Sequence, residues 1–168
     1  EPRQSDKLFI ETWERLRSAT LVAKELGGFV ESLDLEDTSW QCPDLAKPYW
    51  KFIKSDAIKF LEDCVANNQT YDLIYVDDWH SYAHVKRELE LIDQMATPET
   101  VILIHDLMYD NSQPNYHMEL NTTDAQWAEG GPYRAVAELD PAQWEWSTVP
   151  VNHGMTMLRK KSSTIRIF

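Results

Sequence analysis

Acidic and imidazole side chains stand directly after two short apolar runs of the sequence. Residues 71–76 (YDLIYV) are followed by residues 77–80 (DDWH), and residues 100–104 (TVILI) are followed by His105 and Asp106. Carboxylate oxygens are suitable ligands for hard divalent cations. A neutral imidazole accepts a proton near neutral pH. These residue types are therefore able to bind a cation and to move a proton.

Earlier apolar runs also end at or near an acid, at Glu11, Asp34 and Asp56. Taken singly, each acid is equally well interpreted as a helix N-cap or a solvated loop residue, because Asp is a favoured cap. Carboxylates at nearly every strand end are more than solubility requires. The set together favours a functional site.

The apolar patterns predict strands that alternate with helices along the chain. Apolar residues at helical spacing follow the first, third and fourth predicted strands. A polar loop or a short broken helix is expected over 36–48, a longer polar loop over 108–131 and a short helix over 132–139. The predicted strands cover residues 7–12, 29–35, 50–54, 71–76, 100–104, 143–149 and 155–159.

This alternation predicts an α/β fold in three layers, α/β/α. We expect a doubly wound, mostly parallel seven-stranded sheet with an antiparallel C-terminal strand. No internal repeat or linker is visible in the 168 residues, so residues 1–168 are predicted to form a single domain. Ligands of such sheets bind beyond the carboxyl ends of the strands, where the acids and histidines are expected.

Two of these segments carry a family resemblance. Residues 72–82 (DLIYVDDWHSY), the helix after them and residues 101–106 (VILIHD) resemble the second half of class I S-adenosylmethionine (SAM)-dependent methyltransferases. They are most similar to the metal-dependent O-methyltransferases of the catechol type and to their sugar- and macrolide-modifying relatives. Residues 144–158 resemble the last two strands of that Rossmann-like fold.

The resemblance implies a SAM site at the first three strands. Asp34 would accept hydrogen bonds from the ribose hydroxyls, and Asp56 with Ala57 would contact the adenine edge. Glu11, at the end of the first strand, would also belong to the cofactor site.

It also implies a divalent cation, with Mg²⁺ expected first, held by Asp77 and Asp106. His80 would be the catalytic base; its alternative role is to cap or flank the next helix. His105 would be a third ligand, an orienting neighbour or a buried histidine. The implied activity is methyl transfer to a hydroxyl of a small acceptor, with Trp79 as a candidate wall of the acceptor pocket.

The first loop departs from the family pattern. Trp13 and Arg17 stand where glycines are expected to let the backbone approach SAM, and Ala19 replaces a small hydroxyl residue. Arg17 would compensate if it paired with a ligand carboxylate. A second interpretation is therefore a non-catalytic binding or regulatory module that has lost SAM. A metal hydrolase is a third, but it would leave Asp34 and Asp56 without a role.

Composition limits the choice of partners. The formal net charge of −12 argues against nucleic acid and against an anionic membrane. The two cysteines, Cys42 and Cys64, favour isolated reduced thiols and a cytoplasmic location. No apolar run approaches the ~20 residues that span a bilayer. A homo-oligomer is compatible with the sequence, which does not determine the oligomeric state.

Overall fold

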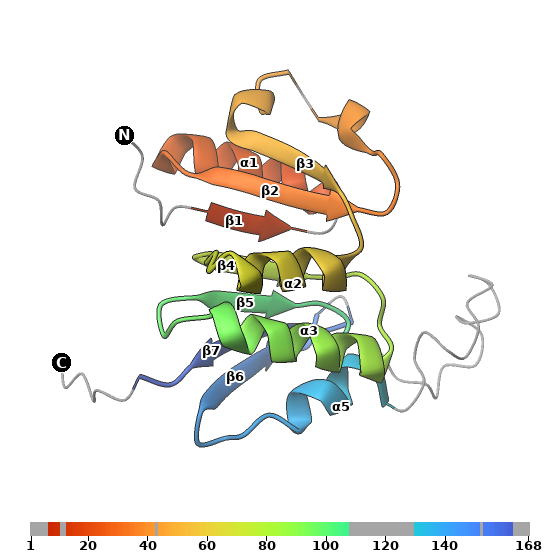
Figure 1. Ribbon diagram of the computed structural model, residues 1–168, viewed down its shortest axis with the longest axis vertical. Coiled ribbons are helices and arrows are strands. Elements are labelled where there is room, and N and C mark those ends of the chain that lie inside the picture. The colour runs from red at the N-terminus through yellow and green to blue at the C-terminus, as the bar shows by residue number, and fades with distance from the viewer. Residues whose placement is uncertain (1–6, 11–12, 43, 108–129, 152, 163–168) are drawn as a thin grey trace.

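The sheet is built around a central group of parallel strands (Figure 1). The computed structural model describes residues 7–10, 13–42, 44–107, 130–151 and 153–162. The sheet has seven strands in the order β3-β2-β1-β4-β5-β7-β6. The strands are β1 (Lys7–Ile10), β2 (Phe29–Asp34), β3 (Trp50–Lys54), β4 (Leu73–Val76), β5 (Val101–Ile104), β6 (Trp144–Val149) and β7 (Met155–Lys160).

The strands from β3 to β5 pair in parallel, so their carboxyl ends meet at one edge. The last strand, β7, lies antiparallel to both β5 and β6. The order reverses between β1 and β4, which is the switch point where such sheets form a ligand crevice. The α/β Rossmann-like class expected from the alternating pattern is confirmed.

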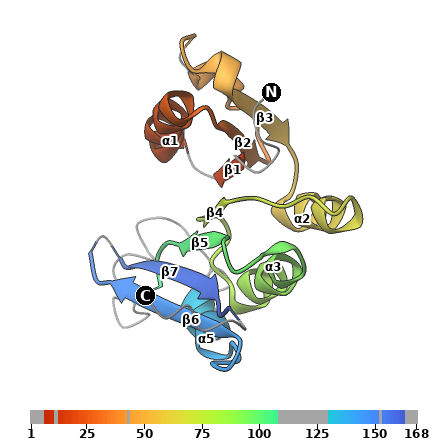
Figure 2. The same ribbon diagram turned by 90° about the vertical axis from the view of Figure 1, so that its left-hand side faces the viewer.

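Helices cover both faces of the sheet. The helix α1 (Trp13–Leu26) lies on one face, and α2 (Ala57–Ala66) and α3 (Tyr82–Met95) lie on the other (Figure 2). The short helix α5 (Gly131–Ala137) packs beside α3. The arrangement has the three layers expected of a doubly wound fold.

A local hydrogen bond fixes the start of α2 and another fixes the start of α3. The Asp56 carboxylate accepts a hydrogen bond from the Lys59 backbone N–H at 3.1 Å and caps α2. The Ser81 hydroxyl accepts from the His84 backbone N–H at 3.3 Å and caps α3. Both caps satisfy a donor that a helix terminus leaves without an intrahelical partner, so each fixes where a strand-end loop becomes a helix.

The core lies mainly between the sheet and the layer of α2, α3 and α5. Its side chains come from alternate positions of the strands and from one stripe of each helix. Among the most buried are Leu61, Ile74, Ile92, Ile102, Ile104 and Leu158. A smaller cluster of Ala23, Val30 and Tyr75 lies on the side of α1. The strand ends are thereby held rigidly from both faces.

Several expected boundaries shift by a few residues. The strand predicted over 7–12 is described over Lys7–Ile10, and the helix predicted over 132–139 runs from Gly131 to Ala137. The predicted loop 36–48 contains the 3₁₀ turn η1 (Ser39–Gln41) and the start of η2 (Lys47–Tyr49). Most of the predicted loop 108–131 lies outside the described residues.

Two observations bear on the compositional expectations. Both Cys42 and Cys64 are buried, and they form no disulfide with each other. Among the described residues, no helix combines the length and the apolar character needed to cross a bilayer.

The alternation of buried and exposed side chains along β7 can be tested with two adjacent residues. Leu158 is fully buried, whereas its neighbour Met157 is 51% exposed. Leu158→Ala should lower the free energy of unfolding by about 2–5 kcal/mol, because it leaves a cavity in the core. Met157→Ala is the matched control and should change it by less than about 1 kcal/mol. Urea denaturation measures both, and equal losses would contradict the assigned faces.

Candidate functional site

The central cluster forms where β4 and β5 end side by side. The two strands pair in parallel with Val76 opposite Ile104, so Asp77 and His105 are the first residues beyond the paired segment. The His105 backbone N–H donates to the Val76 carbonyl at 3.1 Å and extends the pairing by one step. Parallel pairing therefore brings together side chains that are almost thirty positions apart in the sequence.

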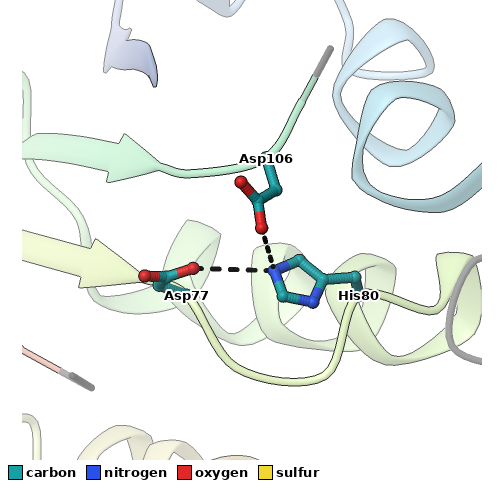
Figure 3. A group of neighbouring side chains, drawn as sticks. All are labelled: Asp77, His80 and Asp106. Atoms are coloured by element: carbon teal, nitrogen blue, oxygen red, sulfur yellow. Dashed lines mark ion pairs between the residues drawn. The ribbon is translucent and has the colours of Figure 1, made fainter. Parts of the chain in front are cut away.

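Two carboxylates and one imidazole face each other in this cluster (Figure 3). The His80 Nε2 atom lies 3.2 Å from Asp106 Oδ2 and 3.6 Å from Asp77 Oδ1. One ligand atom from each of the three residues lies within 4.8 Å of the others. The side chains are only 11 to 16% exposed. A compact set of two oxygens and one nitrogen suits a divalent cation.

His105 joins the same cluster from the other side. Its Nδ1 atom lies 2.7 Å from Asp106 Oδ1 and 3.2 Å from Asp77 Oδ1. The Tyr75 hydroxyl donates to Asp77 Oδ2 at 3.1 Å. These contacts hold the carboxylates in fixed orientations and leave His105 placed either to orient them or to add a ligand.

The backbone of Asp106 is unusual. Its φ is +60°, in the left-handed region that non-glycine residues rarely adopt. Such a conformation costs on the order of 1–3 kcal/mol and persists only where the surroundings impose it. The turn directs the Asp106 carboxylate back toward His80 and Asp77 instead of along the strand direction.

The charge state of His80 follows from this environment. Burial alone would lower the pKa of the imidazole, but the carboxylates of Asp106 and Asp77 outweigh it and raise the pKa to about 9. Without a bound cation, His80 is thus an imidazolium at neutral pH. It supplies positive charge where two acids would otherwise repel each other.

A cavity of about 430 Å³ opens next to the cluster. Asp77 lines it together with three residues predicted to contact the cofactor, namely Asp34, Asp56 and Ala57. Asp56 also caps α2, so the same residue serves as a helix cap and lines the cavity. The volume falls within the range of about 300–1,000 Å³ typical of small-molecule sites.

Trp79 lies on this cavity too, with its side chain 43% exposed. The structure therefore places it beside the predicted cofactor residues Asp34 and Asp56 as well as beside Asp77. Glu11 lies outside the described residues. The side chains of Trp13, Arg17 and Ala19 also lie outside the described part, so their effect on the first loop stays a prediction.

One group was missed at the sequence level. Asp78, His84 and Glu88 bring ligand-type atoms within 4.8 Å of one another at the wall of the cavity. His84 and Glu88 are four residues apart and share one face of α3. That spacing was visible in the sequence, but the contact with Asp78 requires the fold of the intervening turn.

Comparisons with known proteins identify the family and the fold. A family profile described as a methyltransferase domain matches residues 3–107, more than half of the chain. A search of curated proteins found no match. Many solved structures are similar.

Three of these structures are informative. A Staphylococcus aureus protein assigned as a caffeoyl-CoA O-methyltransferase has a TM-score of 0.67 and 13% identity, over 93% of this chain and 76% of that one. The Podospora anserina methyltransferase PaMTH1, solved with S-adenosylhomocysteine (SAH), has a TM-score of 0.66 and 17% identity, over 95% and 74%.

MycE, of the mycinamycin biosynthetic pathway, was solved with Mg and SAH. It has a TM-score of 0.60 and 15% identity, over 95% of this chain and 46% of MycE. At these identities the likeness establishes a shared fold.

The His80 charge can be measured directly. In cation-free protein, NMR of the imidazole carbon-bound protons should give His80 a pKa of about 9. Because this exceeds the unfolded value of about 6.5, the stabilisation is complete below about pH 6.5 and is lost as the pH rises through about 9. Asp106→Asn should lower the His80 pKa. A wild-type pKa at or below 6.5 would contradict the assigned contacts.

Proposed function

Because the chain belongs to the methyltransferase domain family and shares the fold of class I SAM-dependent methyltransferases, we propose that it transfers the methyl group of SAM to a hydroxyl of a small molecule, with assistance from a divalent cation. The observation that carries this proposal is the convergence of Asp77, His80 and Asp106 beside the cavity lined by Asp34 and Asp56. A methyl donor bound in the cavity would therefore lie next to a hydroxyl activated at the cluster.

The donor set fits the proposed cation. Asp77 and Asp106 offer oxygens within 4.8 Å of each other and of His80 Nε2, and carboxylate oxygens are preferred by Mg²⁺. When bound, the cation would supply positive charge that lowers the pKa of the acceptor hydroxyl and fixes its position. We propose Mg²⁺ held by Asp77 and Asp106, with His105 as a third ligand or as the residue that orients them.

The cofactor site is proposed at the cavity. The Asp34 carboxylate stands at the end of β2, where it can accept hydrogen bonds from two ribose hydroxyls. Asp56 and Ala57, at the start of α2, are proposed to contact the adenine edge. Glu11, which lies outside the described residues, stays part of this prediction. The first three parallel strands would thus hold the nucleoside, as the switch point between β1 and β4 favours.

The proposed chemistry is an in-line displacement. The acceptor oxygen forms a bond to the SAM methyl carbon while the carbon–sulfur bond breaks, which converts the sulfonium to the neutral thioether of SAH. The hydroxyl proton passes to the imidazole of His80, which in this proposal is the base and not a cation ligand. His80 accepts it only in the neutral form, so a bound cation would have to offset the carboxylates of Asp106 and Asp77, which otherwise raise its pKa. The charge on these two acids therefore sets whether His80 acts as a base.

Expectations about the acceptor, the partners and the location belong to the same proposal. The acceptor is a small hydroxylated molecule, and the carboxylates on the cavity argue against a nucleic acid partner. Asp34 and Asp56 on the cavity also weigh against a metal hydrolase, which would not use them. A cytoplasmic location and the absence of a membrane partner stay expectations from composition.

Removing a cation ligand tests the mechanism. Asp77→Asn or Asp106→Asn should lower cation-dependent methyl transfer by more than roughly 100-fold, since even residues behind a ligand commonly contribute 10–100-fold. The measurement is transfer of labelled methyl from SAM to catechol and sugar acceptors, with and without Mg²⁺. Asp63→Asn, an exposed acid on α2, is the matched control and should keep full activity. Undiminished turnover in Asp77→Asn would refute its role.

A separate experiment tests the cofactor site. Asp34→Ala should weaken SAH binding by roughly 10- to 100-fold, because hydrogen bonds to a charged group contribute about 1.5–3 kcal/mol. Calorimetry with SAH measures this loss, and Glu36→Ala nearby is the control. Failure of the wild-type chain to bind SAH would favour the alternative of a non-catalytic binding or regulatory module on this fold.

A further inference from the structure

A second cluster, formed by Asp78, His84 and Glu88, fastens the strand-end turn to helix α3. The His84 Nε2 atom lies 2.8 Å from Asp78 Oδ2 and 3.8 Å from Glu88 Oε1. His84 and Glu88 lie one helical turn apart on α3, and Asp78 comes from the loop before the helix. The imidazole is therefore held between a carboxylate of the helix and a carboxylate of the loop.

Burial increases from the loop to the helix. The Asp78 side chain is 26% exposed, His84 is 19% exposed and Glu88 is fully buried. Glu88 Oε1 lies 3.8 Å from the same Nε2 atom that contacts Asp78, which is beyond hydrogen-bond distance. Glu88 therefore acts on His84 through its buried charge, which is felt strongly in a low-dielectric environment.

His84 holds the loop at two points. Its ring contacts Asp78, and its backbone N–H donates to the Ser81 hydroxyl at 3.3 Å. The segment between these points contains Trp79 and His80, and Asp77 directly precedes it. The loop of residues 77–80 is consequently held at Asp78 by the His84 side chain, while the His84 backbone holds Ser81 just beyond it.

This loop serves both halves of the proposed site. Asp78, Trp79 and His84 line the cavity with Asp34 and Asp56. On its other side the loop carries Asp77 and His80, which meet Asp106. Displacing Asp78 would therefore disturb the cofactor wall and the cation ligands together.

We propose that His84, supported by Glu88, is a positioning residue that sets the 77–80 loop, so that nucleoside binding and cation binding depend on one contact. This inference rests on the proposed function, because it assigns SAM to the cavity and a cation to Asp77 and Asp106. His84 itself touches no reacting atom in this assignment. It acts through Asp78.

The test compares two ligands across a short series of variants. His84→Ala should weaken binding of SAH by roughly tenfold, the equivalent of one lost hydrogen bond of about 1.4 kcal/mol. It should also weaken Mn²⁺ binding, although His84 lies outside the Asp77, His80 and Asp106 group. His84→Gln should recover part of both affinities, since the amide N–H can still donate to Asp78. Calorimetry measures SAH and Mn²⁺ separately.

Controls separate positioning from general stability. Arg87→Ala, an exposed residue of the same helix that pairs with Glu62, should leave both affinities unchanged. Thermal unfolding of each variant identifies any that are simply misfolded. Asp78→Ala provides a second route, and the double variant with His84→Ala should lose no more than either single variant, because both remove the same contact.

The possible results have distinct meanings. Unchanged SAH and Mn²⁺ affinities in His84→Ala, with wild-type SAH binding intact, overturn the positioning role alone. If the affinity losses of His84→Ala and Asp78→Ala add up in the double variant, the positioning role is overturned as well. A second Mn²⁺ ion per chain that disappears in His84→Ala would make this cluster a cation site and overturn the proposal. Absence of SAH binding in the wild-type chain overturns the proposed function as well.

Discussion

Two carboxylates, Asp77 and Asp106, are held close together in a partly buried place. Like charges about 4 Å apart repel by about 4 kcal/mol at an effective dielectric of about 20, so the arrangement needs a positive group. His80 provides it as an imidazolium, with a pKa raised to about 9. His105 adds a second contact to both acids. The fold around the strand ends is organised by this need for positive charge between two acids.

The same constraint supports the proposal of a cation at this site. A divalent ion and the proton of His80 satisfy the same pair of carboxylates, so the presence of one reduces the need for the other. The strained backbone at Asp106 is consistent with this interpretation, since residues in sparsely populated conformations cluster at functional sites. The strain is sustained because β5 is anchored between β4 and β7 and cannot shift to relieve it.

Much of the architecture could be predicted because the periodicity is strong. The apolar run before Asp77 became β4, and the helical pattern that follows it became α3. The group of Asp78, His84 and Glu88 was missed. Glu88 interrupts an apolar stripe and a charged residue is usually expected on the solvated face, yet it is fully buried. No local pattern indicates that a loop acid will fold back to meet a histidine in the first turn of a helix.

The sequence alone determined the order of strands and helices and the residue types at the strand ends, because both depend on local periodicity and on where apolar runs stop. The tertiary structure decided which of those residues meet. Parallel pairing of β4 with β5 brought Asp77 to Asp106, and the left-handed turn at Asp106 aimed its carboxylate at His80. The tertiary structure also set the charge of His80, since a pKa depends on the distance to other charges and on burial. Those quantities exist only once the chain has folded.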